Sequence, residues 1–209
     1  VANADLHVGV TTFPSEVGLY VEASLLAGLR ADVQPRGATM TLMIYGAYGF
    51  TGRLIAEEAV ARSLRPVLAG RDAAKLAALG DRLGLPHRAV ALDDAAGLRA
   101  ALAGCGAVIH AAGPFVDTSA PMADACIATG THYLDITGEP TVFAALRATG
   151  PRAEAAGVAL LPGCGFDVVP TDCLAAMVAQ RCPEATRLTL AFAGIATPSR
   201  GTLRTAARN

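Results

Sequence analysis

The sequence predicts an α/β protein built on a doubly wound parallel sheet, and two observations support this fold class. From residue 41 onward, short aliphatic runs alternate with segments of helical periodicity, which is the pattern of repeated βαβ units. The aliphatic runs are apolar throughout, as strands buried on both faces are. Helices should therefore cover both faces of the sheet.

The first three βα units follow one another at short intervals. We expect strands at 41–45, 66–69 and 88–92, and helices at 51–63, 72–83 and 94–102. Asp72 is a suitable N-cap for the second of these helices, and Gly84 provides a residue that can adopt the left-handed conformation at its end.

A fourth strand is expected at 107–111, followed by the turn signal Gly113-Pro114. The pattern beyond this turn predicts helices at 119–129, 140–148 and 168–180, and strands at 131–135, 157–161 and 187–194. Thr171 and Asp172 are candidate capping residues of the last helix.

Composition and charge exclude several classes of function. The chain has 209 residues, of which 53% are hydrophobic and 17% charged, so it should form a packed globular core. Its formal net charge of −1 offers no basic surface for nucleic acid or an anionic bilayer. No run of about 18 apolar residues and no signal peptide is visible. We expect a cytoplasmic protein with a small-molecule substrate.

The five cysteines contain no CxxC pair, so the sequence predicts neither a disulfide framework nor a metal site. Cys164 lies between two glycines, but no companion base is recognisable for a reactive thiol at this position.

The strongest candidate binding site is the glycine-rich turn YGAYGFTG at residues 45–52, between the first strand and the first helix. Gly46, Gly49 and Gly52 have the spacing G-x-x-G-x-x-G. Such a turn lets backbone N–H groups approach a pyrophosphate, and the helix N-terminus adds partial positive charge. A structural turn without a ligand is the alternative, although three glycines here would be costly for stability. The turn predicts a dinucleotide-binding sheet of the Rossmann type.

Arg71 follows the second strand, where such folds select their cofactor. An acidic residue there would bind the ribose 2′-hydroxyl of NAD, whereas an arginine can pair with the 2′-phosphate of NADP. The alternative is that Arg71 is an ordinary surface charge. We predict NADP as the cofactor.

Small residues at 111–113 lie at the end of the fourth strand and leave room for a nicotinamide ribose. His110, directly before them, is more typical of a hydrogen-bonded core histidine than of a catalyst. Asp135, Glu139 and Asp167 lie at the same edge of the sheet, where they could orient a substrate or stabilise a loop. A structural role is favoured, because aspartate and threonine commonly cap helices.

The motifs YGAYGFTGRL, LAGRDAAKL, AAGPF, YLDITGE and LPGCGFDVVPTD resemble, in order and spacing, the NADP-binding half of the saccharopine dehydrogenase-like family. This family includes the trans-acting enoyl reductases, and the resemblance covers about residues 40–205. It implies cofactor contacts from Gly46, Ala47, Gly49, Phe50, Thr51, Gly52, Arg71, Ala112 and Gly113. It identifies no catalytic residue.

The resemblance also predicts three parts in the chain. Residues 40–185 would form the dinucleotide-binding domain, and residues 186–209 would begin a second, incomplete substrate domain. Residues 1–39 have no counterpart in the family and form an unassigned leader, with a candidate strand at 6–13 and a candidate helix capped by Ser15. We therefore expect the chain to be part of a longer protein.

The function implied is an NADP(H)-dependent oxidoreductase, or its cofactor-binding domain, that transfers a hydride to or from a C=N or C=C bond. A non-catalytic NADP-binding module that senses redox state or docks on a larger enzyme is the alternative. A short-chain-dehydrogenase-like enzyme is set aside. It would carry a Tyr-x-x-x-Lys pair, and Lys75, the only lysine, does not follow a tyrosine at that spacing.

Overall fold

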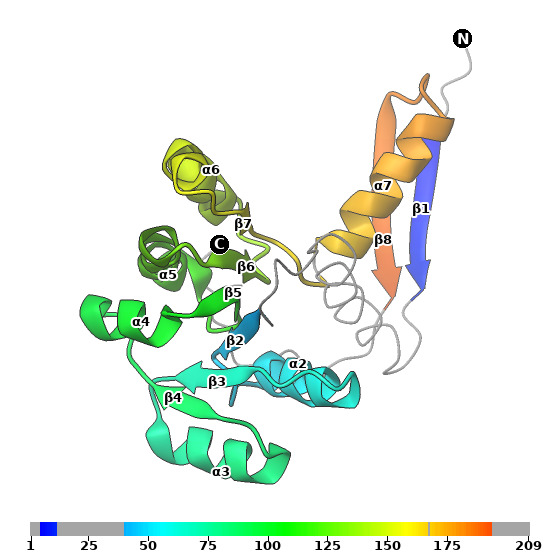
Figure 1. Cartoon of the computed structure of the whole chain (residues 1–209). Helices are drawn as coiled ribbons and strands as arrows, with labels where there is room; N and C mark the ends of the chain where they lie inside the picture. Colours follow the sequence, from blue (N-terminus) through cyan, green and yellow to red (C-terminus); the bar gives the residue numbers. More distant parts are fainter. Residues whose placement is uncertain (1–4, 12–39, 167, 194–209) are drawn as a thin grey trace.

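The computed structural model describes residues 5–11, 40–166 and 168–193, and its main body is a six-stranded parallel sheet (Figure 1). The strand order is β4-β3-β2-β5-β6-β7, which is 3-2-1-4-5-6 when these strands are numbered along the chain. The strands are β2 (Thr41–Tyr45), β3 (Val67–Gly70), β4 (His87–Ala89), β5 (Cys105–His110), β6 (His132–Asp135) and β7 (Leu160–Leu161). The predicted doubly wound Rossmann-type fold is confirmed, with its topological switch point between β2 and β5.

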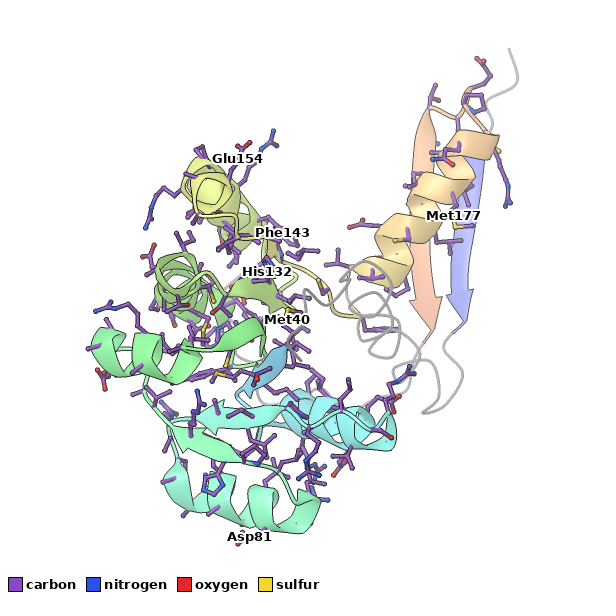
Figure 2. All side chains as sticks on the ribbon, in the orientation of Figure 1. Met40, Asp81, His132, Phe143, Glu154 and Met177 are labelled. Carbon is purple, nitrogen blue, oxygen red and sulfur yellow. The ribbon has the colours of Figure 1, made fainter. Side chains whose placement is uncertain are left out.

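Helices connect the strands and cover both faces of the sheet (Figure 1). Neighbouring residues Met43 and Ile44 are both fully buried but belong to two different core clusters, one on each face. Outward-pointing residues such as Asp81 and Glu154 mark the exposed sides of two helices (Figure 2). The helices are α2 (Phe50–Ala61), α3 (Ala73–Leu83), α4 (Ala95–Leu102), α5 (Phe115–Thr129) and α6 (Pro140–Ala155).

Local signals in the sequence predicted several helix ends correctly. Asp72 accepts a hydrogen bond from the backbone N–H of Lys75 and caps α3. Asp94 caps α4 in the same way. Gly84 ends α3 at a φ of 63°, as a left-handed C-terminal residue does. These ends were predictable because the capping group lies next to the helix that it caps.

Other boundaries differ from the prediction. Helix α5 begins four residues before the expected residue 119, and α6 continues to Ala155 instead of ending at 148. The segment Gly150-Pro151 resembles a helix end, but the chain remains helical through it and buries Ala153 in the core. Tertiary packing therefore overrides the local signal. Strands β4 and β7 are shorter than the expected 88–92 and 157–161.

The prediction that Thr171 or Asp172 caps the last helix is wrong. Helix α7 (Val169–Arg181) has Val168 at its N-cap position without a side-chain cap, and both residues lie inside its first turn. The hydroxyl of Thr171 instead donates to the backbone oxygen of Val168.

Two strands far apart in the sequence form a second, separate sheet. Strand β1 (Asp5–Thr11) pairs in parallel with β8 (Arg187–Ala193), and α7 lies alongside both (Figure 1). The strands expected at 6–13 and 187–194 are therefore present, although β8 does not extend the main sheet. The expected helix after Ser15 lies outside the described residues. Within those residues, no helix combines the length and apolar character needed to cross a membrane.

Candidate functional site

Gly46 is the point at which three strand ends meet. Its φ of +83° lies in the left-handed region that favours glycine, and its N–H donates to the carbonyl oxygen of Ala69 at the end of β3. A Cβ atom on Gly46 would lie 2.9 Å from the backbone nitrogen of Ala112, which follows β5. The fold therefore requires glycine at this position.

Gly52 is also required by packing. It lies in the first turn of α2, and a Cβ atom there would overlap the carbonyl oxygen of Gly46 and lie 3.0 Å from the Cα of Ala47. The absence of a side chain lets α2 approach the end of β2 closely, which is the role expected for the last glycine of a dinucleotide-binding turn.

Gly49 is less constrained than Gly46 and Gly52. Its φ of −68° and ψ of 169° are accessible to any residue, and a Cβ atom would meet only the carbonyl oxygen of Gly46, at 3.1 Å. Gly49 is the N-cap residue of α2 and supplies no side-chain cap. Packing within the protein therefore restricts this position much less than it restricts Gly46 and Gly52, and a ligand that must approach the backbone would explain the glycine fully.

The start of α2 presents unpaired hydrogen-bond donors. The backbone N–H groups of Phe50, Thr51 and Gly52 find no acceptor among the described residues. Three such donors at the N-terminus of a twelve-residue helix form a site suited to an anionic group.

Arg71 lies directly beyond β3 and is exposed. The glycine-rich turn is adjacent, because the carbonyl oxygen of Ala69 accepts the N–H groups of both Gly46 and Ala47, at 2.8 and 3.2 Å. The structure therefore brings the turn that carries Arg71 and the glycine-rich turn to one edge of the sheet. Ala112 and Gly113 join them there through the contact between Ala112 and Gly46.

Glu139 caps a helix that is distant in the sequence. Its side chain is 3% exposed, and its two carboxylate oxygens accept the N–H groups of Phe115 at 3.1 Å and Val116 at 2.9 Å. These are the first residues of α5, so Glu139 fixes the segment that contains Gly113. The favoured structural role is confirmed, and this cap explains why α5 begins earlier than its own sequence indicates.

Asp135 connects two loops at the same edge. Its Oδ2 accepts a hydrogen bond of 2.6 Å from the Tyr133 hydroxyl, and its Oδ1 accepts the N–H groups of Thr137 and Gly163. Burial raises the pKa of this carboxyl above its ordinary value, although these hydrogen bonds act in the opposite direction. Asp135 therefore stabilises the ends of β6 and β7. Asp167 lies outside the described residues.

His110 is a core residue, as expected, but its ring makes no hydrogen bond of ordinary length and angle with the described residues, and its one polar neighbour there is the backbone of Thr118. Its ring is fully buried among Tyr45, Phe115 and Tyr133, and neither ring nitrogen has a hydrogen-bond partner in the described part of the chain. Burial lowers the pKa of His110 to about 3, and the backbone of Thr118 opposes this by a smaller amount. The imidazole is therefore neutral at physiological pH.

Cys164 has the properties of a structural thiol. Its Sγ donates to the carbonyl oxygen of Leu161, and burial raises the pKa of the thiol to about 11. The thiol is protonated near neutral pH, which disfavours a nucleophilic role.

Two residues of the site were missed by the sequence-based prediction. The Tyr48 ring lies over Gly70, and the amine of Lys75 lies 5.6 Å from the centroid of that ring. For Lys75, the sequence offered one signal that could have identified it: the single lysine of the chain lies four residues after Arg71.

Comparison with known proteins identifies a family. Residues 42–161 match the model of the saccharopine dehydrogenase NADP-binding domain. A Mycobacterium tuberculosis protein provisionally named a trans-acting enoyl reductase is 34% identical over 140 residues, which are 63% of this chain and 33% of that protein. The trans-acting enoyl reductase of Mycobacterium leprae is 32% identical over 149 residues, 67% of this chain and 35% of its own length.

A solved structure shares the fold. Saccharopine dehydrogenase (L-Glu forming) from Saccharomyces cerevisiae aligns with a TM-score of 0.61 and 19% identity, over 70% of this chain and 32% of that one. The chain thus spans about a third of the length of each of these three proteins.

Replacing Glu139 with alanine should destabilise the fold, because two backbone N–H groups at the start of α5 lose their acceptors. We expect the free energy of unfolding, measured by urea denaturation, to fall by about 2 to 3 kcal/mol. Glu139→Gln should lose less, since its amide oxygen can still accept. Glu154→Ala removes an exposed carboxylate from the same helix and is the control. A loss in Glu139→Ala no larger than in this control would contradict the capping role.

His110 should make stability depend on pH. Its pKa is lowered in the folded chain, so between about pH 6.5 and 5 the unfolded chain binds a proton that the folded chain does not. Stability should therefore decrease as the pH falls through this range, by about 1.5 kcal/mol from this residue. His110→Leu should remove this contribution in denaturation experiments at both pH values. Identical pH dependence in the two proteins would show that His110 is not held neutral.

Proposed function

This chain belongs to the saccharopine dehydrogenase NADP-binding domain family, and on that basis we propose that it binds NADP(H) as the cofactor-binding part of an oxidoreductase. The single observation that carries the proposal is the turn at Gly49. Here a glycine whose backbone angles any residue could adopt lies beside three N–H groups that have no acceptor in the described part of the chain. A pyrophosphate bound there would explain both features.

The residues of the glycine-rich turn and its neighbours fit the parts of NADP(H). We assign the pyrophosphate to the backbone of Gly46, Ala47, Gly49, Phe50, Thr51 and Gly52. Arg71, exposed beyond β3, would pair with the 2′-phosphate. Ala112 and Gly113 would contact the nicotinamide ribose, since Ala112 lies against Gly46 and carries only a methyl side chain.

When bound, NADPH would supply a hydride and NADP⁺ would accept one, and we propose that the substrate bond reduced in the first direction, or formed in the second, is a C=N or C=C bond. The carboxylates after β6, Asp135 and Glu139, are buried and bonded to backbone N–H groups. These residues therefore contribute a rigid edge for the cofactor rather than proton transfer. The names of the mycobacterial relatives favour a C=C bond, as in an enoyl group.

The remaining parts of the proposal concern the whole protein. Residues 40–185 would be the cofactor domain, and residues 186–209 would belong to a substrate domain to which residues 1–39 contribute β1, the strand paired with β8. The low net charge and the apolar composition support a small-molecule substrate and a cytoplasmic location.

Gly49→Val should abolish NADPH binding without unfolding the chain. The backbone angles of Gly49 suit valine, and the added side chain would occupy the space assigned to the pyrophosphate. We expect at least a hundredfold loss of affinity by calorimetric titration, about 2.8 kcal/mol, with an unchanged circular dichroism spectrum. Gly150→Ala, where a side chain meets open space, should bind as the parent does. A folded Gly49→Val protein that retains affinity would place the cofactor elsewhere.

Arg71→Asp should narrow or reverse the preference for NADPH over NADH. It replaces a charge-assisted contact to the 2′-phosphate with a repulsive one, so a loss on the order of 1.5 to 3 kcal/mol is expected for NADPH alone. Titration of both cofactors into parent and variant measures this. Equal affinities for the two cofactors, unchanged by the substitution, would contradict the assignment.

A further inference from the structure

Lys75, the single lysine of the chain, lies in the first turn of α3, four residues after Arg71. Its side chain is 66% exposed, and its Nζ lies 3.1 Å from Oδ2 of Asp72. The backbone N–H of the same residue donates to Oδ1 of Asp72. The position of the amine is therefore set by Asp72 and by the start of the helix, and the amine remains accessible to solvent.

The Tyr48 ring connects this amine to the glycine-rich turn. Tyr48 belongs to that turn, and its Cε1 lies so close to Gly70 that a Cβ atom on Gly70 would be 2.8 Å away. Gly70 directly precedes Arg71, and the amine of Lys75 lies 5.6 Å from the ring centroid. The ring thus lies between the turn assigned to the pyrophosphate and the turn that carries Arg71.

A ligand phosphate can replace Asp72 as the partner of the Lys75 amine. Both side chains are accessible to solvent, and exposed ion pairs contribute little to stability. The backbone N–H of Lys75 is the main cause that holds the pKa of Asp72 below its ordinary value, and this hydrogen bond remains when the amine leaves, so the carboxylate stays charged. Asp72 would still cap α3 through Oδ1. A phosphate monoester carries close to two negative charges at neutral pH and competes well with one carboxylate for an ammonium group.

We propose that Lys75 is a second residue, beside Arg71, that recognises the 2′-phosphate of NADP(H), and that its amine moves from Asp72 to the phosphate when the cofactor binds. This inference rests on the proposed function of the chain. Arg71 then supplies a planar donor group at the end of β3, and Lys75 supplies a mobile point charge from the first turn of α3. Tyr48 keeps the lysine side chain beside the site before the ligand arrives.

The test compares NADP⁺ with NAD⁺, which differ only in the 2′-phosphate, by calorimetric titration of the 209-residue chain. Lys75→Gln should lower the affinity for NADP⁺ about tenfold and leave the affinity for NAD⁺ unchanged. Lys75→Arg should restore most of the loss because it keeps the charge. Arg82→Gln removes a cation from the far end of the same helix and is the matched control, with both affinities unchanged.

A second measurement does not depend on variants. Because Lys75 is the only lysine, reductive methylation with ¹³C-formaldehyde gives one lysine signal in the NMR spectrum, apart from that of the terminal amine. NADP⁺ should shift the lysine signal much more than NAD⁺ at the same saturation.

The possible failures are distinguishable. If the parent chain binds neither cofactor, the proposed function fails and this inference fails with it. If the parent prefers NADP⁺ and Arg71→Asp removes the preference, but Lys75→Gln leaves it unchanged, only the role of Lys75 is wrong. An equal loss of both cofactors in Lys75→Gln would also overturn it, since that result indicates a structural role.

Discussion

The close backbone packing at Gly46 is the constraint on which the rest of the site depends. At this residue the end of β2 contacts the end of β3 through Ala69 and the segment after β5 through Ala112, and α2 approaches through Gly52. A side chain at Gly46 or Gly52 would overlap the neighbouring backbone. This junction lies at the topological switch point of the sheet, between β2 and β5, and the N-terminus of α2 begins beside it, so the fold and the anion site share these residues.

The acidic residues around this edge stabilise the frame of the site. Glu139 joins the start of α5 to the start of α6, and Asp135 joins the end of β6 to the loop after β7. Each carboxylate accepts backbone N–H groups that would otherwise be buried without partners, which is costly. The backbone N–H groups at the start of α2 and the cations Arg71 and Lys75 remain to meet a ligand, and these suit a phosphorylated dinucleotide.

Much of the fold could be predicted because its signals are local. The apolar strand Thr41–Tyr45 and the caps Asp72 and Asp94 are recognisable from adjacent residues. The early start of α5 was not, because its cap comes from Glu139, 24 residues away. The pairing of β1 with β8 is likewise a contact between distant segments. In the site, the glycines were recognised by their spacing, but only the structure separates Gly49 from the two glycines that packing requires.

The most direct test of the central claim is the response of backbone amides to NADP⁺ in a ¹⁵N-resolved NMR titration. We expect the largest shifts at Phe50, Thr51 and Gly52, whose N–H groups would gain acceptors, with smaller shifts around Ala112. Amides on the outer surface of α6, near Glu154, should not respond. Saturable binding with no shift at the start of α2 would contradict the account, because the cofactor would then lie away from the glycine-rich turn.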